Sequence, residues 1–315
     1  MFLLAFCPGL CLAQSTEAAA PGTSEGTFEL SWSHFERFYA NDGEAKPLDD
    51  AFAPGTRDVT IDALMFRFGG RYVLGPGFVA WVDVPLVRLT RTGETESLLG
   101  DESLYAEAMQ MGDVSGGARL EIPLDVGDLP SAFGVAGVVK APTGTFEKIE
   151  SNQIATGGGD WGLGGELFAL ARPGHVELGA AAGLMLLLPH ERDGVEVDRG
   201  DVRSARIWAI APVGPRARVG ATLSARMREA DRVEGDAVDS LVAGAQPGSL
   251  VPASRLLTVG PFVELSPVRH TRLVVSLNAP TSSWLFVPGE AGWALSGKNV
   301  MVTGTQLHVA FRAKF

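Results

Sequence analysis

The sequence predicts an all-β fold: one antiparallel up-and-down barrel of about twelve strands, of the outer-membrane type. Apolar and polar residues alternate with a period of two along stretches of about ten residues, as in strands with two different faces. The connections between these stretches alternate strictly between short turns and long loops. After residue 13, no apolar run reaches the roughly 18 residues that a membrane-spanning helix needs.

The first segments are expected to lie outside the barrel. Residues 1–13 read as a signal peptide, because a short apolar run is followed by small residues near Ala13, although no Lys or Arg precedes that run. Both cysteines, Cys7 and Cys11, fall within it. Residues 14–26 are small and polar and predict a disordered leader, so the barrel is expected to comprise residues 27–315.

The predicted strands are justified by their alternation. Near the end of the chain, Leu307, Val309 and Phe311 fall on one face, and His308 and Arg312 fall on the other. Most of the stretches are longer than the five or six residues usual in soluble sheets, and they suit tilted membrane strands of about nine to eleven residues. The expected strands cover roughly residues 27–39, 59–74, 78–90, 112–124, 132–142, 161–171, 176–188, 202–213, 216–228, 255–266, 270–280 and 301–315.

The connections predict the orientation. Short turns with Gly or Pro fall at residues 75–77, 126–131, 172–175, 213–216 and 266–270, and long connections at about 40–58, 91–111, 143–160, 189–201, 229–254 and 281–300. An even number of strands then places both termini at the end with the short turns. Outer-membrane barrels have short periplasmic turns and longer extracellular loops. We therefore expect periplasmic termini and extracellular long loops in a Gram-negative bacterium.

The charge is unevenly distributed. The formal net charge is -11, which argues against nucleic acid as a partner because a polyanion would be repelled. The long connections are strongly acidic, and they are either solvated surface or a site for divalent cations or a cationic ligand. Residues 282–295 in the last long connection are unusually apolar, so they either fold into the barrel mouth or pack on neighbouring loops.

The outward stripe is expected to contact outer-membrane lipids and lipopolysaccharide. Trp32, Tyr72, Trp161 and Phe315 have outward parity near strand ends, which are the positions of aromatic girdles. Phe315 also resembles the terminal aromatic residue that the barrel assembly machinery recognises in outer-membrane proteins.

The inward stripe carries the charged residues, because a charge on the lipid face costs roughly 2–4 kcal/mol at mid-membrane. Both signs occur together, which suggests ion pairs between strands. These side chains either line a narrow conduit or fill the barrel, whose bore should lie between filled eight-stranded and open sixteen-stranded barrels. Trp81, Phe168 and Phe262 share this parity. The predicted lumen residues are Arg67, Arg71, Asp83, Arg119, Glu121, Lys140, Glu166, Arg206, Trp208, Arg218, Arg226, Glu264, Arg272, His308 and Arg312.

Catalytic, metal-binding and cofactor-binding residues are not predicted. No two of the five histidines have the spacing of metal ligands. A lipid hydrolase would need a serine beside His34 on the flanking strands, which offer Thr303 and Thr305 instead. The glycine-rich stretch at 157–165 leads into a strand and not into a helix, so it does not predict a phosphate loop.

The middle of the chain resembles a known family. The stretches MGDVSGGARLEIP (111–123), VVKAPTG (138–144) and ATGGGDWGLGGELF (155–168) are similar to the outer-membrane family named for the MetA pathway of phenol degradation. The matching residues are Gly112, Asp113, Lys140, Pro142, Thr143, Gly144, Thr156, Gly157, Asp160 and Trp161. The resemblance implies a porin-like barrel for hydrophobic or aromatic compounds. Asp113 and Lys140 are expected at the barrel mouth, either as functional residues or as an ion pair that holds strand and loop together.

Together these observations predict a channel for small, hydrophobic or aromatic solutes. The alternatives are a barrel that does not conduct but has a structural or ligand-binding role, and a lipid-modifying enzyme.

Overall fold

The computed structural model describes residues 21–39, 44–52, 54–97, 100–126, 129–144, 158–192, 195–234, 253–286, 302 and 304–315. The expected signal peptide, most of the expected leader and most of the apolar stretch at 282–295 lie outside these residues, as do Thr156, Gly157 and Thr303. Within the described residues there is one short 3-10 helix, η1 (Leu48–Ala51), and no helix is long and apolar enough to cross a membrane.

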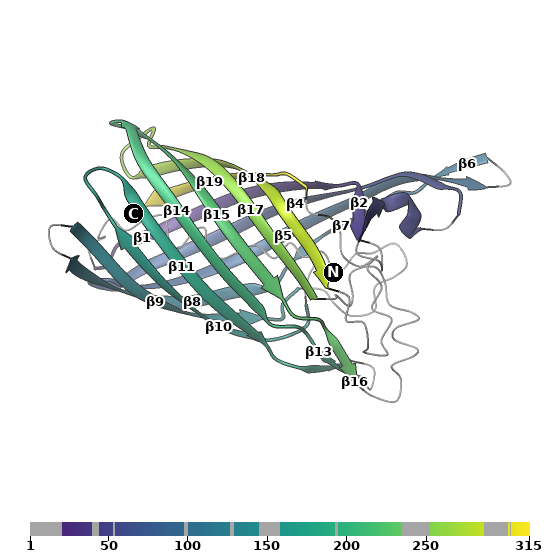
Figure 1. Ribbon diagram of the computed structural model, residues 1–315, viewed down its shortest axis with the longest axis horizontal. Coiled ribbons are helices and arrows are strands. Elements are labelled where there is room, and N and C mark those ends of the chain that lie inside the picture. Colours follow the sequence, from purple (N-terminus) through teal and green to yellow (C-terminus); the bar gives the residue numbers. More distant parts are fainter. Residues whose placement is uncertain are drawn as a thin grey trace.

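Twelve strands form a closed antiparallel barrel, as predicted (Figure 1). The first and last strands pair over nine positions, with Trp32 opposite Leu307, and this pairing closes the sheet. Closure leaves no strand edge unpaired in hydrocarbon. The barrel strands are β1 (Ser24–Phe35), β4 (Thr56–Gly75), β5 (Phe78–Ser97), β8 (Val114–Val126), β9 (Leu129–Ala141), β10 (Gly162–Ala171), β11 (Glu177–Leu187), β14 (Val202–Gly214), β15 (Ala217–Arg228), β17 (Ala253–Leu265), β18 (Thr271–Phe286) and β19 (Gln306–Lys314).

The alternation of the sequence becomes two faces of the barrel wall. In β14, Arg206 and Trp208 are 7% and 5% exposed, whereas Ile207 between them is 55% exposed. Because successive side chains point to opposite faces, one stripe lies inside and the other faces outward. The outward stripe is apolar around the whole circumference, which is the surface that a hydrocarbon environment requires.

The short turns lie at one end of the barrel (Figure 1). β1 starts and β19 ends at this same end, because Glu25 is opposite Lys314. Gly77, in the turn between β4 and β5, has φ +69°, and a Cβ there would lie 2.1 Å from the carbonyl oxygen of Glu121. The backbone N–H of Phe315 donates to the carbonyl of Ser24 at 2.8 Å. β1 thus begins three residues before the expected boundary at residue 27.

The other end is more regular than the sequence predicts. β4 and β5 each have 20 residues and continue past the rim, where Thr60 and Thr92 approach at 2.9 Å and Arg57 donates to Glu94 at 3.0 Å. Such cross-strand polar pairs stabilise a hairpin in water. The long connections also contain β2 (Arg37–Tyr39), β3 (Ala45–Pro47), β6 (Gly100–Ser103), β7 (Ala106–Met111), β12 (His190–Arg192), β13 (Val195–Asp198) and β16 (Arg232–Glu234).

A small apolar core covers the inner side of the extended β4–β5 hairpin. Phe38 of β2 and Leu48 of η1 are buried together with Ile61 and Leu89 of the hairpin. The backbone N–H of Val59 donates to Asp49 at 2.7 Å, which fixes η1 beside β4. The first long connection is therefore folded against the mouth of the barrel.

Four aromatic rings inside the barrel lie against glycines. Trp81, Phe168, Trp208 and Phe262 are each directly opposite a glycine on a neighbouring strand, and the glycines are Gly117, Gly134, Gly179 and Gly220 respectively. A Cβ would lie 1.9 Å from the ring of Phe168 at Gly134, and 2.0 Å from Trp208 at Gly179. The rings of Phe168, Trp208 and Phe262 thus occupy the space that a side chain at the opposite glycine would fill. At Gly117 the nearest atom to a Cβ would be the carbonyl oxygen of Gly137, at 2.0 Å.

Gly134→Ala is expected to destabilise the barrel by about 1–3 kcal/mol, because the added methyl group overlaps the ring of Phe168. The matched control is Gly137→Ala on the same strand, where a Cβ has nothing within 4 Å. Urea unfolding in lipid vesicles measures both free energies of unfolding. Equal losses for the two variants would contradict the ring–glycine packing.

Candidate channel lumen

The structure places the predicted lumen residues on the inward side of the barrel strands. Each has inward parity and is buried or half-buried. These residues are Arg67 and Arg71 of β4, Asp83 of β5, Arg119 and Glu121 of β8, Lys140 of β9, Glu166 of β10, Arg206 and Trp208 of β14, Arg218 and Arg226 of β15, Glu264 of β17, Arg272 of β18, and His308 and Arg312 of β19.

Opposite charges meet inside the barrel. Arg206 donates to both carboxylate oxygens of Glu166 at 2.8 and 2.9 Å, across β11, whose intervening residues are small. Arg218 donates to Glu264 at 2.5 Å on the adjacent strand. Such pairs satisfy buried charges, which are otherwise costly in a medium of low dielectric.

Two carboxylates that pair with inward arginines were not predicted from the sequence. Glu29 lies 3.4 Å from Arg67 and 3.5 Å from Nε2 of His308, and Glu25 lies 3.6 Å from Arg71. Glu29 has inward parity with Ser31 and Ser33, so the alternation of β1 could have identified it. Glu25 falls before the predicted start of the strand, and no signal placed it in the barrel.

Guanidinium groups also cover the inward rings. The Arg119 guanidinium carbon lies 3.8 Å from the centre of the Phe168 ring, and that of Arg206 lies 5.5 Å from the Trp208 ring. Phe168 is therefore held between Gly134 on the wall and Arg119 on the other side. Cation–π contacts of this kind contribute about 0.5–2 kcal/mol. Two of the four inward rings are thus in contact with guanidinium groups.

The motif that carries the family resemblance forms a corner at the mouth. Lys140 Nζ lies 3.1 Å from Asp113 and 2.7 Å from Asp160. Asp113 accepts the backbone N–H groups of Gly144 at 3.0 Å and Gly158 at 2.9 Å. The expected contact between Asp113 and Lys140 is thus an ion pair, and it joins the start of β8 to the end of β9.

Threonine and glycine of the same motif tighten the corner. Thr143 donates to the carbonyl of Gly112 at 2.9 Å and accepts the N–H of Val114 at 2.8 Å. Pro142, between this threonine and the end of β9, is half-buried, and Trp161 is exposed on the outer face. The motif residues therefore hold the loop against the ends of β8 and β9. Trp161 lies beside them on the outer face, at the position of an aromatic girdle.

The ion pairs continue around the rim from Asp160. Arg199 lies 3.4 Å from Asp160 and 3.7 Å from Asp231, and Arg228 lies 2.5 Å from Asp231. All four side chains are less than a tenth exposed. We call the chain from Asp113 through Lys140, Asp160, Arg199 and Asp231 to Arg228 the rim network. The rim network joins loop segments that show no periodic pattern. The sequence therefore did not predict its contacts from Arg199 through Asp231 to Arg228.

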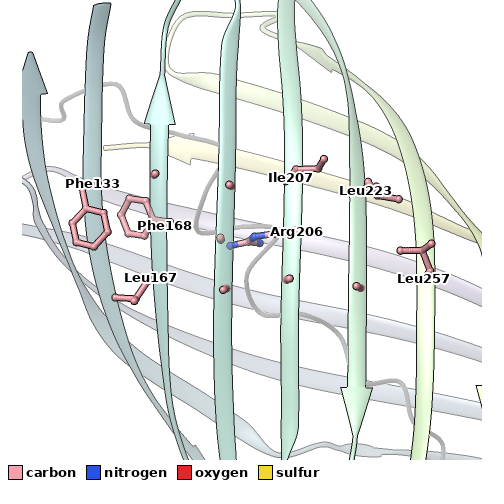
Figure 2. A pocket seen from close by; sticks show the side chains of 13 residues that line it. Phe133, Leu167, Phe168, Arg206, Ile207, Leu223 and Leu257 are labelled. Carbon is pink, nitrogen blue, oxygen red and sulfur yellow. The ribbon is translucent and has the colours of Figure 1, made fainter. Parts of the chain in front are cut away.

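A groove of about 470 Å³ lies on the outer wall (Figure 2). Its rims are Phe133 and Leu167 on one side and Ile207, Leu223 and Leu257 on the other, and alanines of β10, β11 and β14 form most of the lining between them. Phe168, Ala181 and Arg206, with inward parity, complete the lining. The rim residues have outward parity, so the groove belongs mainly to the outer surface and not to the lumen.

His34 lies at the mouth end of β1. Its Nδ1 is 2.9 Å from Asp62 and its Nε2 is 3.1 Å from Glu36, and Trp32 also donates to Asp62 at 3.2 Å. Both ring nitrogens thus face carboxylates. Among the described residues, no three His, Cys, Asp or Glu side chains gather as metal ligands.

Comparisons with known proteins support the fold. An outer membrane channel from Pseudomonas putida F1 superposes with a TM-score of 0.70 at 14% identity, over 96% of this chain and 98% of that chain. The translocator domain of the autotransporter NalP from Neisseria meningitidis gives a TM-score of 0.45 at 10% identity, over 95% of this chain and 90% of that chain. A mutant of the TodX monoaromatic hydrocarbon channel gives a TM-score of 0.43 at 10% identity, over 94% of this chain and 90% of that chain.

The superposition with the Pseudomonas putida channel shows that both chains share the barrel fold. The other two superpositions are too weak to support a conclusion about this chain. No family model and no curated protein matches the sequence.

Asp160→Asn is expected to lower the free energy of unfolding by about 3–5 kcal/mol, because Lys140 and Arg199 would lose a fully buried carboxylate. Asp101→Asn is the control, since its ion pair with Arg57 is exposed and contributes at most about 1 kcal/mol. Urea unfolding in vesicles compares the two variants. The rim network has no stabilising role if both variants unfold like the wild type.

Proposed function

We propose that this protein is an outer-membrane channel of a Gram-negative bacterium that admits small, hydrophobic or aromatic solutes. The observation that carries the proposal is a closed twelve-stranded wall with an apolar exterior and an interior of ion pairs and aromatic rings. The fold shared with the outer membrane channel of Pseudomonas putida F1, over nearly the full length of both chains, supports it.

The orientation follows from the two unlike ends. The short turns and both ends of the described barrel face the periplasm, and the extended hairpin and rim network face outward, as is usual for outer-membrane barrels. The outer wall contacts lipids and lipopolysaccharide. Phe315 is 81% exposed at the periplasmic end, so its ring is accessible to the barrel assembly machinery.

The solute class follows from the lumen wall and from the resemblance to the phenol-degradation family. Phe168 and Trp208 lie against glycines on the wall and are 2% and 5% exposed, so they do not reach across the bore. Arg119 and Arg206 stand beside these rings. A ring-containing solute can exchange contacts with rings and guanidinium groups along this wall.

A barrel that does not conduct is the second candidate. It is favoured by the ion pairs inside the barrel, because Arg206–Glu166 and Arg218–Glu264 each join two nearby strands and fill part of the interior. In this case the barrel would act through its outer loops.

The two candidates differ in conductance. The wild type, refolded and inserted into a planar bilayer, is expected to give discrete current steps. Ala181→Trp should lower the step conductance at least about two-fold, because Ala181 has inward parity at the level of Phe168 and Arg206 in a bore of intermediate width. Ala182→Trp, which has outward parity, should leave the step unchanged.

An absence of steps in the wild type would favour the barrel that does not conduct. Equal effects of the two tryptophans would show that the current does not pass through the lumen.

A further inference from the structure

The groove on the outer wall is a gap between larger apolar side chains. One register row crosses five strands through Leu167, Ala182, Ala205, Ala225 and Leu257, in that order. All five positions have outward parity and line the groove of about 470 Å³ (Figure 2). Three methyl groups therefore lie between two leucine side chains, and the wall is hollowed where they lie.

Two arginines lie on the outward face in the next row toward the mouth. Arg203 of β14 and Arg255 of β17 are there on either side of Met227 of β15, and all three are exposed. Arg203 pairs with Glu229 at 2.7 Å, and its side chain is still 61% exposed. Arg255 also interacts within the chain and remains exposed. The two arginines and Glu229 together leave one excess positive charge.

The depth of this row follows from its charge. An arginine on the lipid face is costly at mid-membrane and is tolerated near the interface, where anionic head groups supply the opposite charge. Ala205 follows Arg203 by two residues, so the groove begins about 7 Å further along the strand, toward the hydrocarbon. Guanidinium groups suit the oxygens of phosphate. The surface thus has a cationic upper edge and an apolar lower part.

The lower part requires an apolar occupant. Apart from Arg206, the residues that line the groove are apolar. Side chains beside an unfilled gap lose their dispersion contacts, so hydrocarbon chains should occupy the groove in a membrane. A second copy of the barrel fits less well. Two copies in one membrane are related by an axis along the membrane normal, which brings the same arginines of both copies to the same level.

We propose that this surface binds one molecule of lipopolysaccharide, with an acyl chain in the groove and phosphate groups against Arg203 and Arg255. The two arginines are on strands two apart in the sheet, so their backbones are about 10 Å from each other. This spacing suits a head group with more than one phosphate, such as the phosphorylated glucosamine disaccharide of lipopolysaccharide. The inference rests on the proposed function for its membrane and orientation, which place the arginines in the outer leaflet.

The test is native mass spectrometry of the full chain, refolded in detergent without cellular lipid. The probes are lipid A, which is the phosphorylated lipid anchor of lipopolysaccharide, its dephosphorylated form, and phosphatidylglycerol, all at equal concentration. The wild type is expected to retain one lipid A, at least about fivefold more than either other lipid. Combining Arg203→Gln with Arg255→Gln should lower lipid A retention at least about fivefold.

Arg88→Gln is the control for charge. Arg88 is also exposed with outward parity, and it pairs with Glu107 at 2.7 Å, as Arg203 does with Glu229. It lies on β5 and does not border the groove. This variant should retain lipid A like the wild type.

A second pair of variants tests the groove itself. Ala205→Leu fills the hollow and should lower lipid A retention at least about fivefold, because the acyl chain loses its place. Ala209→Leu is the matched control, since Ala209 is exposed on the same strand and face but does not line the groove. It should retain lipid A like the wild type.

Folding of each variant is checked by its heat-dependent migration on a gel. If the double arginine variant does not fold, Ala205→Leu and its control decide. Unchanged lipid A retention in the folded variants overturns the proposal. Equal retention of phosphatidylglycerol or of dephosphorylated lipid A also overturns it, as does a dimer that Ala205→Leu dissociates, because a second copy would then occupy the groove.

This experiment separates the lipid site from the channel. Lipid retention is measured without any current, so retention that depends on Arg203 and Arg255 in a barrel without current steps would keep the lipid site and remove the channel. Current steps without lipid A retention would keep the channel and overturn the lipid site.

Discussion

The backbone must pair all of its polar groups where water is absent, and this constraint determines the rest of the structure. Each unsatisfied N–H or C=O in hydrocarbon costs several kcal/mol, so a sheet can cross only if its last strand returns to its first. The pairing of β1 with β19 meets this condition. Closure in turn forces every strand to have one face toward lipid and one toward the lumen, and the chain's alternation of residue types is the consequence.

The two faces follow different rules. The outward residues need only be apolar, so leucine, valine and alanine are all suitable there. The inward residues must neutralise one another in a confined space, so they depend on particular partners on other strands, such as Glu166 for Arg206. This difference explains why the lumen combines ion pairs, cation–π contacts and rings that pack against glycines.

The barrel was predictable because period two is a local property that a single sequence displays. Strand positions, the closed antiparallel topology and the parity of the inward residues all follow from it. The rim network was only half predictable: Asp113 and Lys140 belong to a motif, whereas Arg199 and Asp231 lie in separate connections that meet only after folding. The extension of β4 and β5 was hidden because threonines and charges at their ends read as loop, although they pair across the hairpin. Whether a charge on the inner face has a partner depends on register, so the inward arginines could be placed from the sequence but their partners could not be identified.

The opposition of ring and glycine across neighbouring strands also limits how this chain can evolve. Phe168 and Gly134 share one volume, as do Trp208 and Gly179, so neither member can grow unless the other shrinks. Substitutions at these sites should therefore occur in pairs of residues that are distant in the sequence. An alignment of related barrels would show these pairs as correlated changes in side-chain volume, even where overall sequence identity is low.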